Sequence, residues 1–225
     1  MKRSLVGLAS LALALSASTA TAQMIGNPVY VPIGMGTGVS LAGDYGRGLN
    51  NASGKGNYFG GRVTLGLPFF YVMAGAGTFK AKGAASSQTA FGADIGMNLL
   101  DLPLVPVKVS AQAGGGYVKS GSYKQLDVPI AVAIGLSLPT PGIGITPWVA
   151  PRVHIQHTSG AGASSTDVRF GGSAGINAHF GMLGVHAAVD YISFKAPAGS
   201  GLSSGDVSPL VFGIGASLGL TVPGL

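Results

Sequence analysis

The sequence has no cysteine and no glutamate, and it carries little charge of either sign. All seven of its acids are Asp, against 13 Lys and Arg in 225 residues. Only 9% of the residues are charged, whereas a typical soluble domain has about 25%. The lack of Cys excludes disulfides, and a soluble enzyme with so few charges and no Glu would be unusual. Intrinsic disorder is excluded as well, because 47% of the residues are hydrophobic and disordered chains are poor in such residues.

Past its N-terminus, the sequence also lacks a hydrophobic run of the ~20 residues that a transmembrane helix requires. The N-terminus itself has a basic start at Lys2 and Arg3, an apolar run from Leu5 to Leu15, and the small-x-small triplet Ala20-Thr21-Ala22. This order is typical of a secretory signal peptide. We therefore expect residues 1–22 to be a cleaved signal peptide and residues 23–225 to form one exported domain.

Glycine is abundant, with 39 residues, and hydrophobic residues alternate with small or polar ones. In the clearest segment one face of a strand would be wholly aliphatic, and it comprises Leu126, Val128, Ile130, Val132, Ile134, Leu136 and Leu138. The opposite face carries Asp127, Pro129, Ala131, Ala133, Gly135 and Ser137. A period of two separates these sets on a strand, while a helix would mix them.

Ten segments show this alternation, and most have the ~9–11 residues that a tilted membrane-spanning strand needs. They are residues 34–43, 58–67, 69–79, 91–99, 105–114, 126–138, 143–156, 169–180, 185–194 and 210–220. Short connections at 67–68, 100–104, 139–142 and 181–184 alternate with longer polar ones at 44–57, 80–88, 119–124, 157–166 and 195–206. Short turns at one rim and long loops at the other are typical of outer-membrane barrels, whose turns face the periplasm. The fold class that follows is all-β: a closed antiparallel transmembrane β-barrel of about ten strands, with eight as the alternative.

Aromatic residues near the ends of these segments predict two girdles at the membrane interfaces. One girdle would contain Tyr58, Phe59, Phe79, Phe91, Tyr117, Phe170, Tyr191 and Phe194, and the other Phe69, Phe70, Tyr71 and Phe180.

The glycine-rich alternation of Val211-Phe212-Gly213-Ile214-Gly215-Ala216 and of Val39 to Gly46, together with the signal peptide, resembles the small outer-membrane β-barrel proteins of the OmpA, OmpX and OmpW kind. The resemblance implies a monomeric protein of the cell outer membrane, with extracellular loops and periplasmic termini. It also implies contacts with outer-membrane lipid, lipopolysaccharide and the barrel-assembly machinery.

If the aliphatic faces contact lipid, the opposite faces fill the interior. Strand parity then predicts an interior charge network of Arg62, Asp94, Lys108, Asp127, Arg152, Arg169 and Asp190, joined by His154, His179 and His186. Isolated buried ions are very costly, so these charges must pair. Two hypotheses follow: an ion-pair network that plugs a narrow barrel, or a charged constriction that selects ions or small solutes.

The sequence therefore predicts a non-enzymatic envelope protein, either structural or a narrow pore. Surface adhesion through the long loops is one alternative. The other is a hydrolase, because His157-Thr158-Ser159 with Asp167 nearby resembles the site of barrel lipid A deacylases, where His is the base and Ser the nucleophile. That family uses a Glu, which this sequence lacks. We expect no cofactor, no metal and no nucleic-acid partner, since the basic residues are scattered and no phosphate-binding loop is present.

Overall fold

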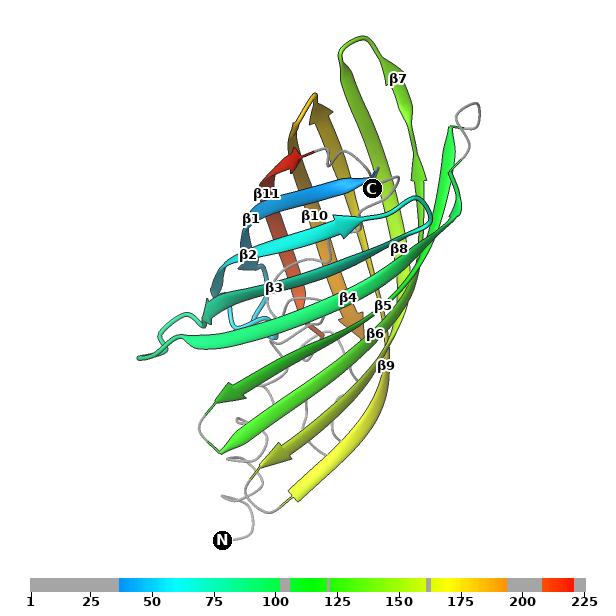
Figure 1. Ribbon diagram of the computed structural model, residues 1–225. Helices are drawn as coiled ribbons and strands as arrows, with labels where there is room; N and C mark the ends of the chain where they lie inside the picture. The colour runs from blue at the N-terminus through cyan, green and yellow to red at the C-terminus, as the bar shows by residue number, and fades with distance from the viewer. Residues whose placement is uncertain (1–36, 102–105, 121, 161–162, 194–207, 221–225) are drawn as a thin grey trace, which may run out of the picture.

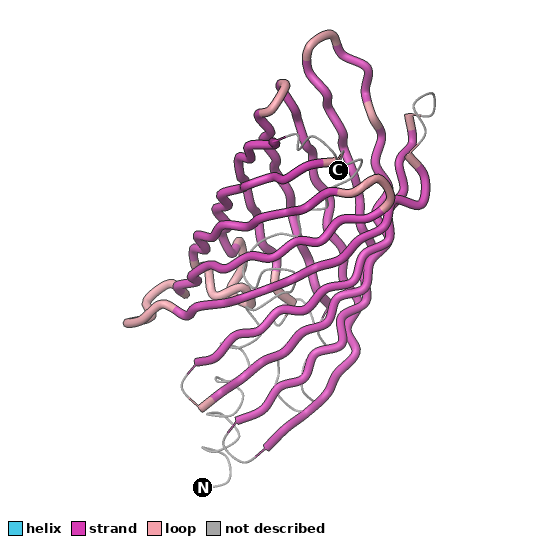
Figure 2. The backbone as a smooth tube through the Cα atoms, viewed as in Figure 1, coloured by secondary structure: helices cyan, strands magenta, loops and turns pink. Residues whose placement is uncertain are grey.

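The computed structural model describes residues 37–101, 106–120, 122–160, 163–193 and 208–220, and most of them lie in strands (Figure 2). The signal peptide expected at residues 1–22 lies outside these ranges. The strands are β1 (Gly38–Gly48), β2 (Asn57–Gly66), β3 (Phe70–Lys80), β4 (Gln88–Leu100), β5 (Val107–Ser120), β6 (Tyr123–Leu136), β7 (Leu138–Thr140), β8 (Ile143–Gly160), β9 (Ala163–Phe180), β10 (Leu183–Ser193) and β11 (Leu210–Leu220). No helix in the described part of the chain is long and apolar enough to cross a membrane.

The strands form one antiparallel sheet that closes on itself (Figure 1). β1 pairs with both β2 and β11, and β6 pairs with both β5 and β8, so that ten strands complete a ring. The three-residue β7 is not part of the ring, since it only extends the wall beyond β6 by pairing with β8. Closure leaves no sheet edge along the ring, as a barrel in hydrocarbon requires.

The distribution of side chains is the reverse of that in a soluble protein. Large aliphatic residues are exposed on the outer face, and they include Leu41, Val63, Val72, Ile95, Ile130, Val132, Ile134, Val149, Ile176, Val185 and Ile214. Charged and amide side chains are buried instead, among them Asp44, Arg62, Asp94, Asp127, Arg152 and Asp190. An apolar outer wall around a polar interior is the pattern of a barrel that is solvated by lipid.

Two features of the predicted strand boundaries are wrong. The first strand runs from Gly38 to Gly48 rather than over 34–43, so Asp44 belongs to a strand and not to a loop. Most of the predicted loops 119–124 and 157–166 are strand, because the β5–β6 and β8–β9 hairpins extend until only residues 121–122 and 161–162 connect them. The connections therefore do not alternate strictly in length. We call the end with connections 49–56, 81–87, 121–122, 161–162 and 194–209 the loop rim, and the opposite end the turn rim.

Several interior aromatic rings lie over glycines of neighbouring strands. Tyr71 on β3 is the pairing partner of Gly96 on β4, and Trp148 on β8 is the partner of Gly175 on β9. A Cβ atom at either glycine would collide with the ring. The predicted girdles are consequently wrong for Tyr58, Tyr71 and Phe79, whose exposed fractions are 0%, 1% and 4% and which fill the interior.

The substitution Gly96→Ala is expected to destabilise the barrel, because the new methyl group would displace the buried Tyr71 ring. The expected cost is about 1–3 kcal/mol, as for other overpacked sites. Gly115→Ala is the matched control, since no atom lies within 4 Å of the added Cβ there. The free energy of unfolding of both variants is measured by urea titration in lipid vesicles, with heat-modifiable gel migration used to monitor the folded fraction. Equal stability of the two would contradict the assigned packing.

Candidate functional site

A first group of buried charges lies where β1, β2 and β10 face the interior, and we call it the Asp44 cluster. Arg62 Nη2 donates a hydrogen bond to Asp44 Oδ1 over 2.8 Å. His186 Nε2 lies 3.0 Å from the same oxygen and 3.3 Å from Arg62 Nη2. Gly215 of β11 stands between β1 and β10, and a side chain there would collide with His186 and Asp44. The cluster therefore depends on a glycine in the closing strand.

A second group, the Arg152 cluster, is held by β4, β6, β8, β9 and β10. Arg152 Nη2 lies 3.0 Å from Asp190 Oδ1 and also contacts the Ser173 hydroxyl. Asp127 and Asp94 add to the negative field around the guanidinium. Asp127 Oδ2 in turn lies 3.0 Å from His154 Nδ1, and both side chains are fully buried. Arg152 thus pairs directly with Asp190, and Asp127 has its direct contact with His154.

Neutral hydrogen bonds fill the interior toward the turn rim. Tyr71 Oη donates to Gln112 Oε1 over 2.8 Å, and Trp148 Nε1 donates to Asn177 Oδ1 over 3.0 Å. Tyr71 and Asn177 are each 1% exposed. Buried polar groups of this kind are stable only when they are hydrogen-bonded, so the pairs fix the side chains in place.

At the loop rim, the connection 49–56 folds toward the interior side of β1. Ser53 is 1% exposed, and it lies against the inward face of Gly48. Asn50 anchors this connection, because its Nδ2 donates to Ser208 O over 2.7 Å and its Oδ1 accepts from Leu210 N over 3.2 Å. The connection is thereby attached to the start of β11.

The structure separates the predicted network into buried and peripheral members. Arg62, Asp94, Asp127, Arg152 and Asp190 are buried together with His154 and His186. Lys108 pairs with Asp101 over 2.7 Å near the turn rim, and Arg169 pairs with Asp167 over 3.2 Å near the loop rim. Both of these pairs are partly exposed, and His179 is exposed near the turn rim.

The sequence argument missed Asp44, and its inclusion changes the balance of charge. Four buried carboxylates, those of Asp44, Asp94, Asp127 and Asp190, face the guanidinium groups of Arg62 and Arg152. The parity argument had expected four positive charges against three negative ones. His154 and His186 lie beside these carboxylates, and each contacts an Asp.

The residues considered for a hydrolase lie on two faces of the sheet, with His157 and Ser159 on the outward face and Asp167 on the other. His157 Nδ1 lies 2.9 Å from Thr166 Oγ1, and His157 points outward. Asp167 pairs with Gln156 across the strands, and so faces the opposite side of the sheet from His157. Among the described residues, no group of three or more His and Asp side chains could hold a metal ion.

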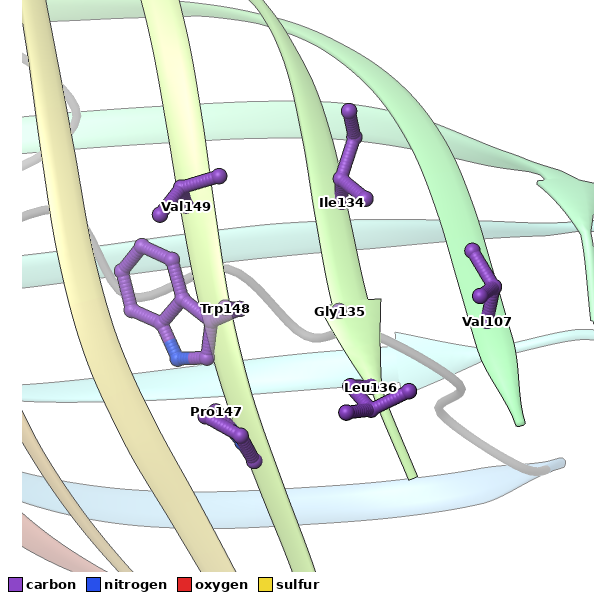
Figure 3. Close-up of a pocket in the computed structure, with 7 residues that line it drawn as sticks. All are labelled: Val107, Ile134, Gly135, Leu136, Pro147, Trp148 and Val149. Atoms are coloured by element: carbon purple, nitrogen blue, oxygen red, sulfur yellow. The ribbon is translucent and has the colours of Figure 1, made fainter. Parts of the chain in front are cut away.

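A cleft lies in the wall between β5, β6 and β8 (Figure 3), lined by Val107, Ile134, Gly135, Leu136, Pro147, Trp148 and Val149. Val107, Ile134 and Val149 are exposed on the outer face. The indole N–H, which is the only side-chain polar group of this lining, is bonded to Asn177. The cleft thus offers apolar contact and no group for acid–base chemistry.

No protein-family model matches the sequence, and no curated protein matches it significantly. Solved structures that resemble it include a bacterial polysaccharide outer membrane secretin, with 12% identity, a TM-score of 0.44, and coverage of 74% of this chain and 57% of that chain. The N-terminal β-barrel domain of Pseudomonas aeruginosa OprF has 10% identity and a TM-score of 0.37, with coverage of 83% and 100%. LpxR from Salmonella typhimurium has 9% identity and a TM-score of 0.43, with coverage of 80% and 99%. The chain spans little more than half the length of the secretin.

The substitution Arg152→Ala is expected to lower the free energy of unfolding by about 3–5 kcal/mol, because it leaves buried carboxylates without their cation. Lys108→Ala removes a cation from the partly exposed pair with Asp101 and is expected to cost about 0–1 kcal/mol. Urea titration of both variants in the same vesicles measures the difference. A small effect of Arg152→Ala would show that the Arg152 cluster does not stabilise the barrel.

Proposed function

We propose that this protein is a structural, non-enzymatic barrel of the outer membrane whose interior is sealed by its own side chains. The observation that carries the proposal is the burial of the interior polar groups. Asp127 and His154 are 0% exposed, and Asp190 and Asn177 are 1% exposed. A conducting constriction would leave such groups in contact with water.

Placement in a membrane is supported by the outer wall. Exposed apolar patches on soluble monomers rarely exceed a few hundred Å², whereas here exposed aliphatic side chains occur on strands all around the ring. Only closed barrels and helices satisfy every backbone group in hydrocarbon. The basic N-terminus and the apolar run that follows it support export across the inner membrane.

The proposal that the protein is not an enzyme is supported by the positions of its titratable groups. His154 and His186 are engaged by Asp127 and Asp44 inside the wall, and neither lines the cleft between β5, β6 and β8. His157 lies outside, and Asp167 is engaged by Arg169. A catalytic His is oriented by a third group, and Asp167 does not provide this because it faces the opposite side of the sheet from His157.

Planar-bilayer recordings test whether the interior is sealed. The wild-type protein is expected to show no conductance steps. The double variant Arg152→Ala/Asp190→Ala removes the central ion pair and is expected to conduct, with a preference for cations because Asp94 and Asp127 remain. Asp101→Ala/Lys108→Ala, which removes the ion pair near the turn rim, is the control and should stay silent. Conductance steps from the wild-type protein would contradict a sealed interior and would indicate a narrow pore. Folding of the protein in buffer without detergent would exclude a membrane barrel.

A second candidate function, surface interaction, is favoured by the β8–β9 hairpin. Each of its strands has 18 residues, whereas about 9–11 residues suffice to span a bilayer. At one end of the barrel this hairpin extends past β10, which ends at the pairing of Ser193 with Phe170, while β6 lies beside it up to the pairing of Lys124 with Ser159 (Figure 1). A regular hairpin of that length presents a fixed surface beyond the membrane.

Replacing residues 157–166 with an Asn-Gly turn tests this candidate, because Gln156 and Asp167 are pairing partners and can flank a tight turn. The shortened barrel is expected to keep its heat-modifiable migration. Cells that display it are expected to adhere less to one another and to matrix-coated surfaces. Unchanged adherence would exclude the hairpin as an adhesive element.

A further inference from the structure

The outward-facing cations of the barrel all lie near one rim. Eight Lys and Arg residues lie on the described strands, and Arg62, Lys108, Arg152 and Arg169 have inward strand positions. The other four point outward near the loop-rim ends of their strands: Arg47 on β1, Lys80 on β3, Lys119 on β5 and Lys124 on β6. We call these four residues the basic collar.

The basic collar borders the apolar wall. Arg47 is the next outward position after Tyr45, and Lys119 is the next after Tyr117. Lys124 likewise adjoins Leu126, which is 46% exposed. Arg47, Lys119 and Lys124 therefore each lie two residues nearer to the loop rim than an outward-facing residue that suits the hydrocarbon or its interface.

No carboxylate compensates the collar within the described residues. Asp44, Asp94, Asp127 and Asp190 face the interior, and Asp101 and Asp167 pair with Lys108 and Arg169. The ion pairs found in the described part of the chain include none of the four collar cations. On the described strands, the outer wall thus carries positive charge near one end only.

Lys119 and Lys124 place two of these charges directly opposite each other. They are pairing partners in the β5–β6 hairpin, and Ser159 of β8 pairs with Lys124 on the other side. Val118 and Gln125, the adjacent partners, are 3% and 2% exposed and face inward, so both lysines face outward. Like charges directly opposite across a sheet are destabilising. An anion between the two ammonium groups would remove that repulsion.

We propose that the basic collar binds the headgroup phosphates of anionic lipids in the leaflet at the loop rim, with Lys119 and Lys124 as its principal site. The proposal rests on the proposed membrane function, because a phosphate plane borders the apolar wall only in a bilayer. Cations near an anionic lipid surface each contribute about 1 kcal/mol. This corresponds to about fivefold in affinity for each lysine.

The experiment compares the wild type with Lys119→Gln/Lys124→Gln in phosphatidylcholine vesicles that contain a minor fraction of spin-labelled phosphatidylglycerol. The relative association constant of the anionic lipid over spin-labelled phosphatidylcholine is the readout. The matched control is Lys55→Gln/Lys82→Gln, which removes the same charge from exposed positions in the connections 49–56 and 81–87. The wild type and the control are expected to prefer the anionic lipid, while the collar variant should lose about fivefold for each lysine removed.

Equal selectivity of the wild type and the collar variant would overturn the proposal, and so would an equal loss in the control. Inorganic phosphate, added against chloride at constant ionic strength, distinguishes a lipid site from a site for the free ion. Displacement of the lipid by millimolar phosphate would reject the lipid assignment. Heat-modifiable migration in pure phosphatidylcholine is scored separately. If the barrel inserts into phosphatidylcholine but shows no preference for the anionic lipid, only the lipid-binding role of the basic collar is refuted. If the barrel fails to insert, the proposed membrane function is refuted.

Discussion

The requirement that every backbone polar group be hydrogen-bonded in hydrocarbon governs this structure. It forces the strands into a closed ring, and a closed ring has an interior of fixed width. Lipid around the barrel excludes charged side chains from the outer wall. The ionisable residues within the membrane span must therefore point into the interior. The pairing of Arg62 with Asp44 and of Arg152 with Asp190 follows from that confinement.

The interior is packed without a conventional hydrophobic core. Rings from Tyr71 and Trp148 occupy the space that glycines on the neighbouring strands leave free. Amide groups of Gln112 and Asn177 then satisfy the polar atoms of those rings. The glycine content of the sequence is therefore partly a packing requirement, because a larger residue at Gly96 or Gly175 would meet a ring that is already bonded.

The alternation in the sequence was sufficient to predict the all-β barrel and the inward positions of Arg62, Asp94 and Arg152, because strand parity depends only on local spacing. It did not predict the partners of these residues, which depend on the register among strands that are distant in sequence. Asp44 was missed because Gly43-Asp44 resembles the beginning of a loop. Tyr58 was assigned to a girdle because position along a strand does not distinguish an interfacial ring from an interior one. Ser, Thr and Gly at 157–166 favour turns and so predict a loop, and cross-strand pairing overrides that preference.

The order of strand pairing has a consequence for how the chain folds. Each neighbouring pair in the ring is formed by strands close in sequence except β1–β11, which come from opposite ends of the chain. That pairing must bear the largest loop-closure entropy and is the natural last step of assembly. The Asp44 cluster spans this junction, with Asp44 on β1, His186 on β10 and Gly215 of β11 between them. A slip by one residue in the β1–β11 pairing would put Asp44 and His186 on opposite faces of the sheet, while the β1–β2 pairing would still hold Asp44 beside Arg62. The contact between Asp44 and His186 therefore forms in one register of closure only.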